Sequence, residues 1–461
     1  MSEMPNGWAI CSLADIGLIV TGKTPSTKEP RFYDGNIPFI KPGDLDHSGL
    51  IYKTENSLTD AGAAEVPSLP PQSIVVTCIG NLGKVGLTTT VSATNQQINA
   101  VIPDEGINPN FLLHFCKTLK PWLEKKSSAT TISIVNKSIF SEAAVLIAPL
   151  AEQTRIAQKL DELLTQVDSL KARIDDIPAQ LKRFRQSVLA AAVSGRLTED
   201  WRKMQPNRAL SDIADLPEGL KANWWPGGIP DGWQFEYYEN IIDSRLGKML
   251  DKAKNSGLPA PYLGNINVRW FKFDTDSLQE ILINESERLE LAVLNGDVLI
   301  CEGGEPGRCA IWRGGKQVTV FQKALHRART PPNLLPEWLV FNIKNDADGN
   351  TLAQLFTGTT IKHLTGRALA RYPLRLPPIA EQTEIVRRVE QLFAFADNLE
   401  TKVASAKSRI DNLTQSILAK AFRGELVPQD PNDEPASVLL ERIKAQRAAT
   451  PKSKRSRKTS V

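Results

Sequence analysis

The sequence contains PLAEQTRI at residues 149–156 and a near copy, PIAEQTEI, at residues 378–385. Each copy is followed by a second pair of related segments: QSVLA and SGRL at 186–190 and 194–197, against QSILA and RGEL at 415–419 and 423–426. The displacement is 229 residues at both ends, because Glu152 matches Glu381 and Gly195 matches Gly424. An unchanged register over this length predicts a rigid repeated element.

Each copy carries apolar residues at alternating spacings of four and three, which is the heptad pattern of a coiled-coil seam. We expect two helices, near 152–195 and 381–424, each roughly 65 Å long at 1.5 Å per residue. They should pack antiparallel, because the chain crosses a whole domain between them. The expected seam is Ile156, Leu160, Leu163, Val167, Leu170, Ile174, Ile177, Leu181, Phe184 and Val188 in the first copy, and Ile385, Val389, Leu392, Ala396, Leu399, Val403, Ala406, Ile410, Leu413 and Ile417 in the second.

Proline precedes each expected helix and glycine follows it, as is typical of helix ends. Pro178 lies inside the first copy where the second has Lys407. Proline removes a backbone donor and crowds the preceding turn, so the first helix should kink or break there. The alternative is that the two long helices are buried separately, each in its own globular domain.

The segments around the helices are also duplicated, but loosely. The matches are Pro5–Trp8 with Pro230–Trp233, Ile74–Cys78 and Gly80 with Val298–Cys301 and Gly303, Asn95–Gln97 with Phe321–Lys323, and Thr130–Ile132 with Thr359–Ile361. We therefore expect a globular domain and a long helix, twice over. The expected boundaries are 1–150 for the first domain, 151–196 for its helix, 197–229 for a linker, 230–379 for the second domain, 380–425 for its helix and 426–461 for a C-terminal segment.

Composition favours a soluble, reduced, cytoplasmic protein. No apolar run approaches the roughly 20 residues that span a membrane, and the N-terminus lacks a signal pattern. The five cysteines are scattered without a Cys-x-x-Cys pair, and the four histidines form no ligand spacing. This pattern supports neither a disulfide framework nor a metal site, so no metal or cofactor is expected in this chain.

The net charge of +4 says less than its distribution. Lys452, Lys454, Arg455, Arg457 and Lys458 lie in a Ser/Thr/Pro setting that should be disordered, and this tail either solvates the chain or contacts phosphates. Arg and Lys suit phosphates and guanine edges, while Asn and Gln can read adenine. The candidate DNA-binding residues are Lys23, Lys28, Arg31, Lys41, Asn81, Lys84, Asn95, Gln96 and Gln97 in the first domain, and Arg245, Lys248, Lys252, Lys254, Asn265, Asn267, Arg269, Arg308, Gln322 and Lys323 in the second.

Several catalytic motifs are missing from the sequence. It has neither a P-loop for ATP nor the Asn/Asp-Pro-Pro-Tyr/Phe motif of amino-methylating enzymes. Pro103-Asp104 with Glu124-Lys125-Lys126 resembles a nuclease pattern, but such loose patterns arise often by chance, and the latter residues follow an expected helix at 111–120. The glycine-rich segments at 80–83 and 303–307 are expected to be strand-ending turns rather than phosphate loops.

The helix motifs carry a family resemblance. AEQTRIAQKLD at 151–161, LKRFRQ at 181–186 and GRLTEDW at 195–201 resemble the central conserved region of type I restriction–modification specificity (S, HsdS) subunits. EIVRRVEQLF at 384–393 and LTQSILAKAFRGEL at 413–426 resemble the distal one. The resemblance implies an α/β (α+β) fold: two target-recognition domains with small sheets, separated by two antiparallel coiled-coil helices in a pseudo-twofold internal repeat.

The resemblance also implies a function. Each domain would bind one half of a bipartite double-stranded DNA site, and the helices would set the gap between the halves. Two modification subunits would bind S-adenosylmethionine and methylate adenine at N6, and two restriction subunits would use ATP and Mg to translocate and cleave DNA. This chain itself would be non-catalytic. Two rival hypotheses are a catalytic chain, namely a fused nuclease or methylase, and a different non-catalytic chain. The latter would be a coiled-coil DNA-binding scaffold that does not read sequence, or a target-recognition component of a related methylase–nuclease.

Overall fold

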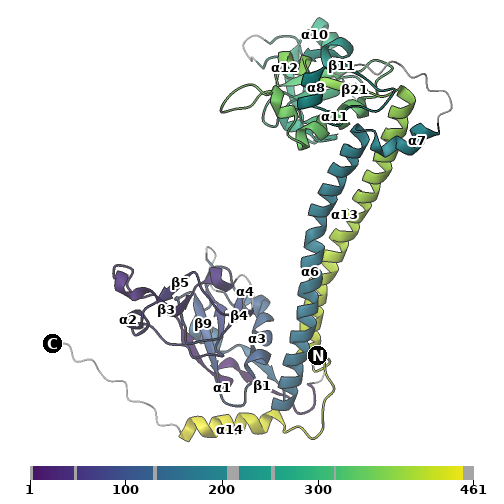
Figure 1. Cartoon of the computed structure of the whole chain (residues 1–461). Helices are drawn as coiled ribbons and strands as arrows, with labels where there is room; N and C mark the ends of the chain where they lie inside the picture. Colours follow the sequence, from purple (N-terminus) through teal and green to yellow (C-terminus); the bar gives the residue numbers. More distant parts are fainter. Residues whose placement is uncertain are drawn as a thin grey trace. The chain divides into compact units, whose positions relative to one another are not determined.

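The computed structural model describes residues 4–45, 49–127, 132–204, 217–250, 255–315 and 318–449. The chain divides into two compact units, one made of Met1–Ile174 with Ser405–Val461 and the other of Asp175–Ala404. Each unit contains a globular domain and a part of both long helices (Figure 1). We call the globular parts the first and second domains. The expectation of mixed α/β domains with small sheets is confirmed.

The first domain contains a five-stranded sheet in the order β2-β9-β6-β7-β4, a three-stranded sheet β5-β3-β8 and the pair β1-β10. All four residues of β6 are buried, which explains the unbroken apolar run at 74–77. The elements are β1 (Ala9–Ser12), α1 (Leu13–Ile16), β2 (Gly17–Thr21), η1 (Pro30–Phe32), β3 (Tyr33–Ile40), η2 (Pro42–Leu45), β4 (Gly49–Ile51), β5 (Asn56–Leu58), α2 (Asp60–Ala63), β6 (Ile74–Thr77), β7 (Val85–Thr88), β8 (Ala93–Thr94), β9 (Ile98–Pro103), α3 (Pro109–Lys117), α4 (Lys120–Lys126), α5 (Lys137–Ser141) and β10 (Ala144–Ile147).

The second domain contains the sheets β12-β20-β17-β18 and β16-β13-β19, and the pairs β11-β21 and β14-β15. Its elements are β11 (Gln234–Tyr237), α9 (Tyr238–Ile241), β12 (Asp243–Leu246), β13 (Leu258–Leu263), η4 (Asn265–Asn267), β14 (Val268–Arg269), β15 (Lys272–Phe273), β16 (Gln279–Ile283), α10 (Glu285–Glu290), β17 (Val298–Cys301), β18 (Cys309–Ile311), β19 (Val320–Phe321), β20 (Leu325–Arg329), α11 (Pro336–Asp348), η5 (Leu352–Leu355), α12 (Gly366–Ala370) and β21 (Pro373–Leu376). The described part of the segment before it forms η3 (Arg196–Thr198), α7 (Glu199–Lys203) and α8 (Glu218–Asn223).

The two domains share one topology. In the first, β3 pairs with β8 in parallel, with Phe39 opposite Ala93 and Ile40 opposite Thr94. In the second, β13 pairs with β19 in the same way, with Leu263 opposite Phe321. The sheets β2-β9-β6-β7 and β12-β20-β17-β18 also correspond strand for strand. The internal repeat expected from the motifs is therefore present in the folded domains, with β4 and the β14-β15 hairpin as additions to one copy each.

The long helices are α6 (Leu150–Val193, 44 residues) and α13 (Ile379–Ala421, 43 residues). Within the first unit, the start of α6 packs in one core with the end of α13, which includes Ile417 and Leu418. Within the second, the end of α6 packs in one core with Ile385 and Val389 at the start of α13. The helices are therefore antiparallel in each unit, as expected. Of the predicted kink or break at Pro178, the break is wrong, because α6 continues through this residue.

Most of the expected seam faces the interior. Of these side chains, Ile156, Leu160, Val167, Leu181, Val188, Ile385, Val389, Ala396 and Ile417 are buried, and Leu163, Ile174, Ile177, Phe184, Leu392, Leu399, Val403, Ala406 and Ile410 are half-buried. Leu170 and Leu413 differ, since each is 45% exposed. A seam between only two helices is open at its flanks, and a straight helix drifts from a strict seven-residue repeat. These two leucines therefore do not close the seam.

The repeated Glu-Gln pair fixes the start of each helix to its domain. The buried Glu152 accepts a hydrogen bond from the indole Nε1 of Trp8 at 3.0 Å. Glu381 accepts the same bond from Trp233 at 2.9 Å. The neighbouring Gln153 accepts from the backbone N of Asn108, the residue that caps α3. Both matched motifs of the sequence, the Trp and the Glu-Gln pair, therefore belong to one anchoring contact.

One helix was not expected from the sequence. Helix α14 (Ala436–Ala449) lies in the segment 426–461, and its Leu439, Leu440 and Ile443 are buried in the core of the first unit. Arg447 at its end pairs with Asp104 and donates to the carbonyl of Ala14 at 2.5 Å. The helix is thus an integral part of the first unit. The basic tail at 452–458 lies outside the described residues.

Candidate nucleic-acid interface

In the first domain, four loops at the ends of strands β2, β3, β6 and β8 are joined by backbone hydrogen bonds. The N of Lys23 donates to Thr94 O at 2.9 Å, and the N of Asn95 donates to Ile40 O at 3.1 Å. The N of Cys78 donates to Gln97 O at 2.8 Å. These bonds draw basic and amide residues together on one edge of the domain. We call this the first polar edge, comprising residues 22–24, 40–45, 77–84 and 94–98.

The second domain repeats the same bonds. The N of Lys248 donates to Phe321 O at 3.0 Å, and the N of Gln322 donates to Leu263 O at 3.0 Å. The N of Cys301 donates to Arg308 O at 2.8 Å, as that of Thr77 does to Lys84 O at 3.0 Å. The second polar edge therefore comprises residues 247–249, 263–267, 301–308 and 321–325. The bonds pair Lys23 with Lys248, Lys84 with Arg308, and Asn95 with Gln322.

The structure corrects two of the expected sequence matches by one residue. Asn95 was matched to Phe321, but its backbone bond places it with Gln322. Gly80 was matched to Gly303, but the loop bonds pair it with Gly304, and both of these glycines have positive φ, at +79° and +75°. Only glycine adopts this backbone conformation without strain. The glycine-rich segments are turns after strands, as expected, and do not open helices.

Two of the paired cations hold loops in place. The Nζ of Lys84 donates to Pro42 O at 3.2 Å, and a guanidinium nitrogen of Arg308 donates to Asn265 O at 2.9 Å. These carbonyls occupy equivalent loops, each closed by a side chain that accepts from the first residue: Asp44 from Lys41 N at 2.8 Å, and Asn267 from Gly264 N at 2.9 Å. The cations therefore position the loops that follow β3 and β13.

The first pair of lysines is engaged in a similar way. Lys23 donates its Nζ to Glu65 O at 3.0 Å, just beyond α2. Lys248 forms an ion pair with Glu287 of α10, the helix that occupies the place of α2 in the second domain. Each lysine thus fastens the start of its loop to a short helix of the same domain.

The other candidates divide by exposure. Asn95 and Asn267 are buried and accept bonds within their own turns, and Asn267 also donates to Asp274 O at 3.0 Å. Lys41 donates to Asn56 at 2.6 Å. Gln97 accepts from the amide of Asn95 at 2.9 Å, and Asn265 donates to Gly303 O at 2.8 Å. Asn81, Gln96 and Lys323 are exposed on the polar edges, whereas Gln322 is half-buried against Gly264.

The remaining candidates lie off the polar edges. Arg31 pairs with Glu29, Arg245 with Glu290, and Arg269 with Asp274, while Lys28 is exposed. Lys252 and Lys254 lie outside the described residues.

Two residues of this site lie in the loops predicted at 23–31 and 245–254 but were not named individually as candidates. Thr24 donates its hydroxyl to Gln96 at 2.6 Å, and Met249 follows Lys248 as Thr24 follows Lys23. The contact of Thr24 crosses between loops that are far apart in sequence, so no local spacing signals it.

Two thiols and one imidazole near the polar edges favour their neutral forms because they are buried. Burial raises the pKa of the Cys78 and Cys301 thiols, each to about 11. Burial also lowers the pKa of His326, which bonds to Leu364 O at 2.9 Å. Neutral buried thiols are poor nucleophiles. Across the described ranges, no group of three His, Cys, Asp or Glu side chains could hold a metal ion.

A sequence family described as the type I restriction modification DNA specificity domain matches residues 5–179 and again residues 231–406. The chain belongs to the type I restriction–modification specificity subunits. It is 32% identical to the EcoKI specificity subunit of Escherichia coli K12 and 31% identical to the StySPI specificity subunit of Salmonella potsdam, with 99% of each chain covered in both comparisons. These matches confirm the family expected from the helix motifs, and with it the DNA-specificity role.

Solved structures support the fold of this specificity subunit. A chain from a study of complex assembly and conformational transition of the type I R-M system has a TM-score of 0.68 at 17% identity, with 92% of this chain and 100% of that chain covered. The HsdS subunit of Thermoanaerobacter tengcongensis has a TM-score of 0.58 at 19% identity, with 92% and 98% covered.

The family assignment confirms that the specificity subunit is a non-catalytic recognition component, and it does not favour either rival hypothesis. The acidic groups of the nuclease-like pattern each have a basic partner: Asp104 pairs with Arg447 of α14, and Oε1 of Glu124 lies 4.0 Å from Nζ of Lys120 on α4. Among the described residues, no helix is long and apolar enough to cross a membrane.

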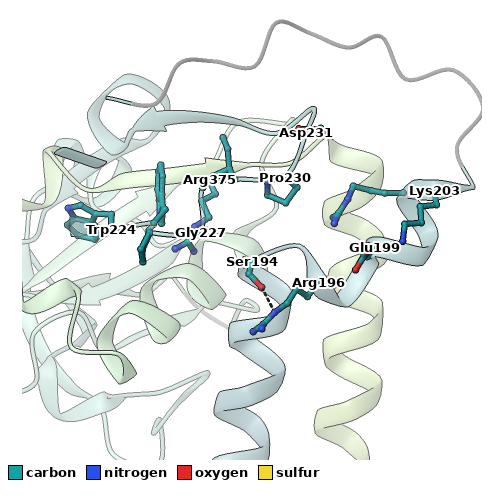
Figure 2. A pocket seen from close by; sticks show the side chains of 14 residues that line it. Ser194, Arg196, Glu199, Lys203, Trp224, Gly227, Pro230, Asp231 and Arg375 are labelled. Carbon is teal, nitrogen blue, oxygen red and sulfur yellow. Dashed lines mark hydrogen bonds and ion pairs between the residues drawn. The ribbon is translucent and has the colours of Figure 1, made fainter. Parts of the chain in front are cut away.

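A separate cavity of about 710 Å³ lies in the second unit of the specificity subunit, at the end of α6 (Figure 2). It is lined by Ser194 and Arg196, which follow α6, by residues of α7 and of the segment at 224–231, and by Arg375, and by none of the second polar edge. The guanidinium of Arg375 lies 5.1 Å from the centre of the Trp225 ring. The cavity therefore belongs to the junction between helix and domain rather than to the candidate DNA interface.

Proposed function

We propose that this specificity subunit reads a bipartite double-stranded DNA site, with each half bound at the polar edge of one domain. The duplicated polar edge supports the proposal. The same backbone hydrogen bonds form the edge in both domains, but the exposed side chains on the two edges differ. Phosphate contacts position a protein on DNA, whereas contacts to base edges read sequence. Two frames with different side chains suit two half-sites of different sequence.

The partners follow from this role. The relatives are named as subunits of type I restriction enzymes, so we propose that this chain assembles with two modification subunits and two restriction subunits in a bacterial cytoplasm. S-adenosylmethionine, ATP and Mg would bind on those partners. An adenine must leave the base stack before it is methylated, so each polar edge would hold DNA beside a base-flipping partner.

Methylome mapping tests the proposal directly. We expect cells that contain this chain and its modification partner to carry N6-methyladenine at one two-part motif. Deleting the chain alone should remove methylation at that motif and at no other. Methylation that persists without the chain, or that lacks a two-part consensus, would contradict the proposed function.

The helices would set the gap between the half-sites. Seven residues of helix span about 10.5 Å, close to three base pairs at about 3.4 Å each. Deleting residues 167–173 from α6 and the matched 396–402 from α13 preserves the seam register. Both half-sites should persist while the gap shortens, provided that the twist of the DNA can follow. Altered half-sites with an unchanged gap would show that the helices are not the ruler.

A further inference from the structure

The two polar edges differ at the turn that follows Asn95 and Gln322. The next residue is Gln96 in the first domain and Lys323 in the second, and both are exposed. The same backbone bond closes both turns, from Ile98 N to Asn95 O at 3.2 Å and from Leu325 N to Gln322 O at 3.0 Å. Gln96 and Lys323 therefore stand at equivalent places on equivalent frames, with different chemistry.

The residue beside the turn changes together with it. Thr24 donates its hydroxyl to Oε1 of Gln96 at 2.6 Å, which fixes the amide group. In the second domain the equivalent residue is Met249, which cannot donate such a bond. A glutamine has one accepting and one donating end, so its orientation decides which groups it recognises. A lysine ammonium carries donors only and needs no such partner.

These two side chains suit different bases. A glutamine amide can donate to N7 of adenine and accept from its N6 amino group, whereas a lysine donates to N7 and O6 of guanine. The bond from Thr24 uses one lone pair of Oε1, which leaves the second lone pair and both amide hydrogens for a base. In the described residues, the ammonium of Lys323 has no hydrogen-bond or ion-pair partner, so it too is available.

We propose that Gln96 and Lys323 are equivalent specificity-determining residues: Gln96 selects adenine in one half-site, and Lys323 selects guanine at the corresponding position of the other. Thr24 acts as a positioning residue for Gln96. This inference rests on the proposed function, because it requires the polar edges to face DNA. The cations at equivalent positions, Lys23 with Lys248 and Lys84 with Arg308, bond to other loops of their own domains. They therefore position the loops and do not distinguish the half-sites.

Exchange of the two residues tests the inference in the assembled complex. Gln96→Lys should replace a preference for adenine by one for guanine at one position of the first half-site, with a change of about tenfold or more in relative methylation. Lys323→Gln should do the reverse in the second half-site. Gln158→Lys and Lys402→Gln make the same charge changes on exposed helix positions, and both should leave the motif unchanged.

Site selection from random duplexes by the purified complex gives the same readout without depending on methylation. Thr24→Val should relax selection at the position read by Gln96 and leave the second half-site intact. Selection that stays as strict in Thr24→Val would overturn the positioning role.

The possible failures are distinguishable. A wild-type motif that is bipartite but unaltered by both exchanges, or that has no adenine in the first half-site, overturns the inference and leaves the proposed function standing. Gln96→Lys could instead strengthen binding to every sequence alike and steepen its salt dependence. This result would assign position 96 to a phosphate contact and would also overturn the inference. A wild-type complex that selects no two-part motif defeats the proposed function itself.

Discussion

Each long helix is joined to its domain by the same Trp–Glu contact, Trp8 with Glu152 in the first unit and Trp233 with Glu381 in the second. The two buried carboxylates differ in how many hydrogen-bond and ion-pair partners they have. In both, a carboxylate that is 1% exposed accepts from an indole, at 3.0 and 2.9 Å. The second oxygen of Glu381 accepts from the Thr198 hydroxyl at 2.8 Å and pairs with Arg202. The second oxygen of Glu152 is buried without a hydrogen-bond partner.

The two carboxylates have different partners because different residues follow the long helices α6 and α13. By the register of the repeat, Thr198 and Arg202 correspond to Val427 and Pro431, neither of which can donate a side-chain hydrogen bond. Burial raises the pKa of Glu152, while the Trp8 indole, the nearby Arg155 and the side chain of Gln429 oppose the shift. A shared motif therefore preserves a shape without preserving its electrostatics, and the two junctions should respond differently to mutation and pH.

Loss of Arg202 should have the largest effect on this comparison. Arg202→Met leaves a buried carboxylate without its cation, and removing one partner of a buried pair costs about 3 kcal/mol. Arg155→Met is the control in the first unit. Arg155 is the arginine near Glu152, but its ion-pair partner is Asp433 and its side chain is 34% exposed. This substitution should cost less than about 1 kcal/mol. Hydrogen exchange of the amides in the first turns of α6 and α13 measures both, and equal losses would contradict the comparison.

Neutralising the two carboxylates should separate the junctions again. Glu381→Gln deprives the half-buried Arg202 of its counter-charge and should cost about 2 kcal/mol. Glu152→Gln keeps an acceptor for Trp8 and removes a buried charge that has no directly paired cation, so its effect should stay within about 1 kcal/mol of zero. The same exchange measurement applies. A greater loss for Glu152→Gln would mean that its charge is compensated by a contact other than those described.

A hydroxyl at position 427 should make the first junction more similar in stability to the second. Val427→Thr introduces the side chain that Thr198 provides in the second unit, and a new hydrogen bond to Glu152 should stabilise the first junction by about 0.5–1 kcal/mol. Val427→Ala is the control, since it removes methyl groups without supplying a donor. Stabilisation by alanine as well as by threonine would rule out the hydrogen bond as the cause.

The smallest expected effect is a difference between the wild type and Glu152→Gln in how the free energy of unfolding depends on pH. The folded-state pKa of Glu152 is raised above its ordinary value of 4.5 by burial. Its stabilising contribution is therefore fully present below that value and is lost as pH rises through the raised pKa. The wild type should gain stability over Glu152→Gln as pH falls through this window. Urea unfolding of both proteins at several pH values measures the gain, and parallel curves would show that Glu152 does not titrate within it.

The sequence predicted the scaffold better than the site, for a physical reason. Heptads and the repeated Glu-Gln pair are periodic or local, so the helices could be predicted from spacing, and their antiparallel direction from the domain that lies between them. The pairing of Asn95 with Gln322 depends on backbone bonds to Ile40 and Leu263, which lie more than 50 residues away. The sequence match was one residue off there because the intervening loops differ in length.

Helix α14 and the role of Thr24 escaped prediction for related reasons. The apolar residues Leu439, Leu440 and Ile443 make no extended heptad pattern, and their partners belong to a domain at the other end of the sequence. Thr24 gains its significance only from a contact with Gln96 across two loops. Neither signal is contained in a window of neighbouring residues.

The place of α14 also has a consequence for synthesis on the ribosome. The second unit is one continuous segment, Asp175–Ala404, whereas the first is completed only by Ser405–Val461. Domains made first usually fold first as the chain emerges. Here the earliest residues to be translated must wait for Leu439 and Ile443 before their core can close. The second domain can therefore finish folding before the first. A translation product that ends before α14 would contain a folded second domain and an incompletely folded first domain.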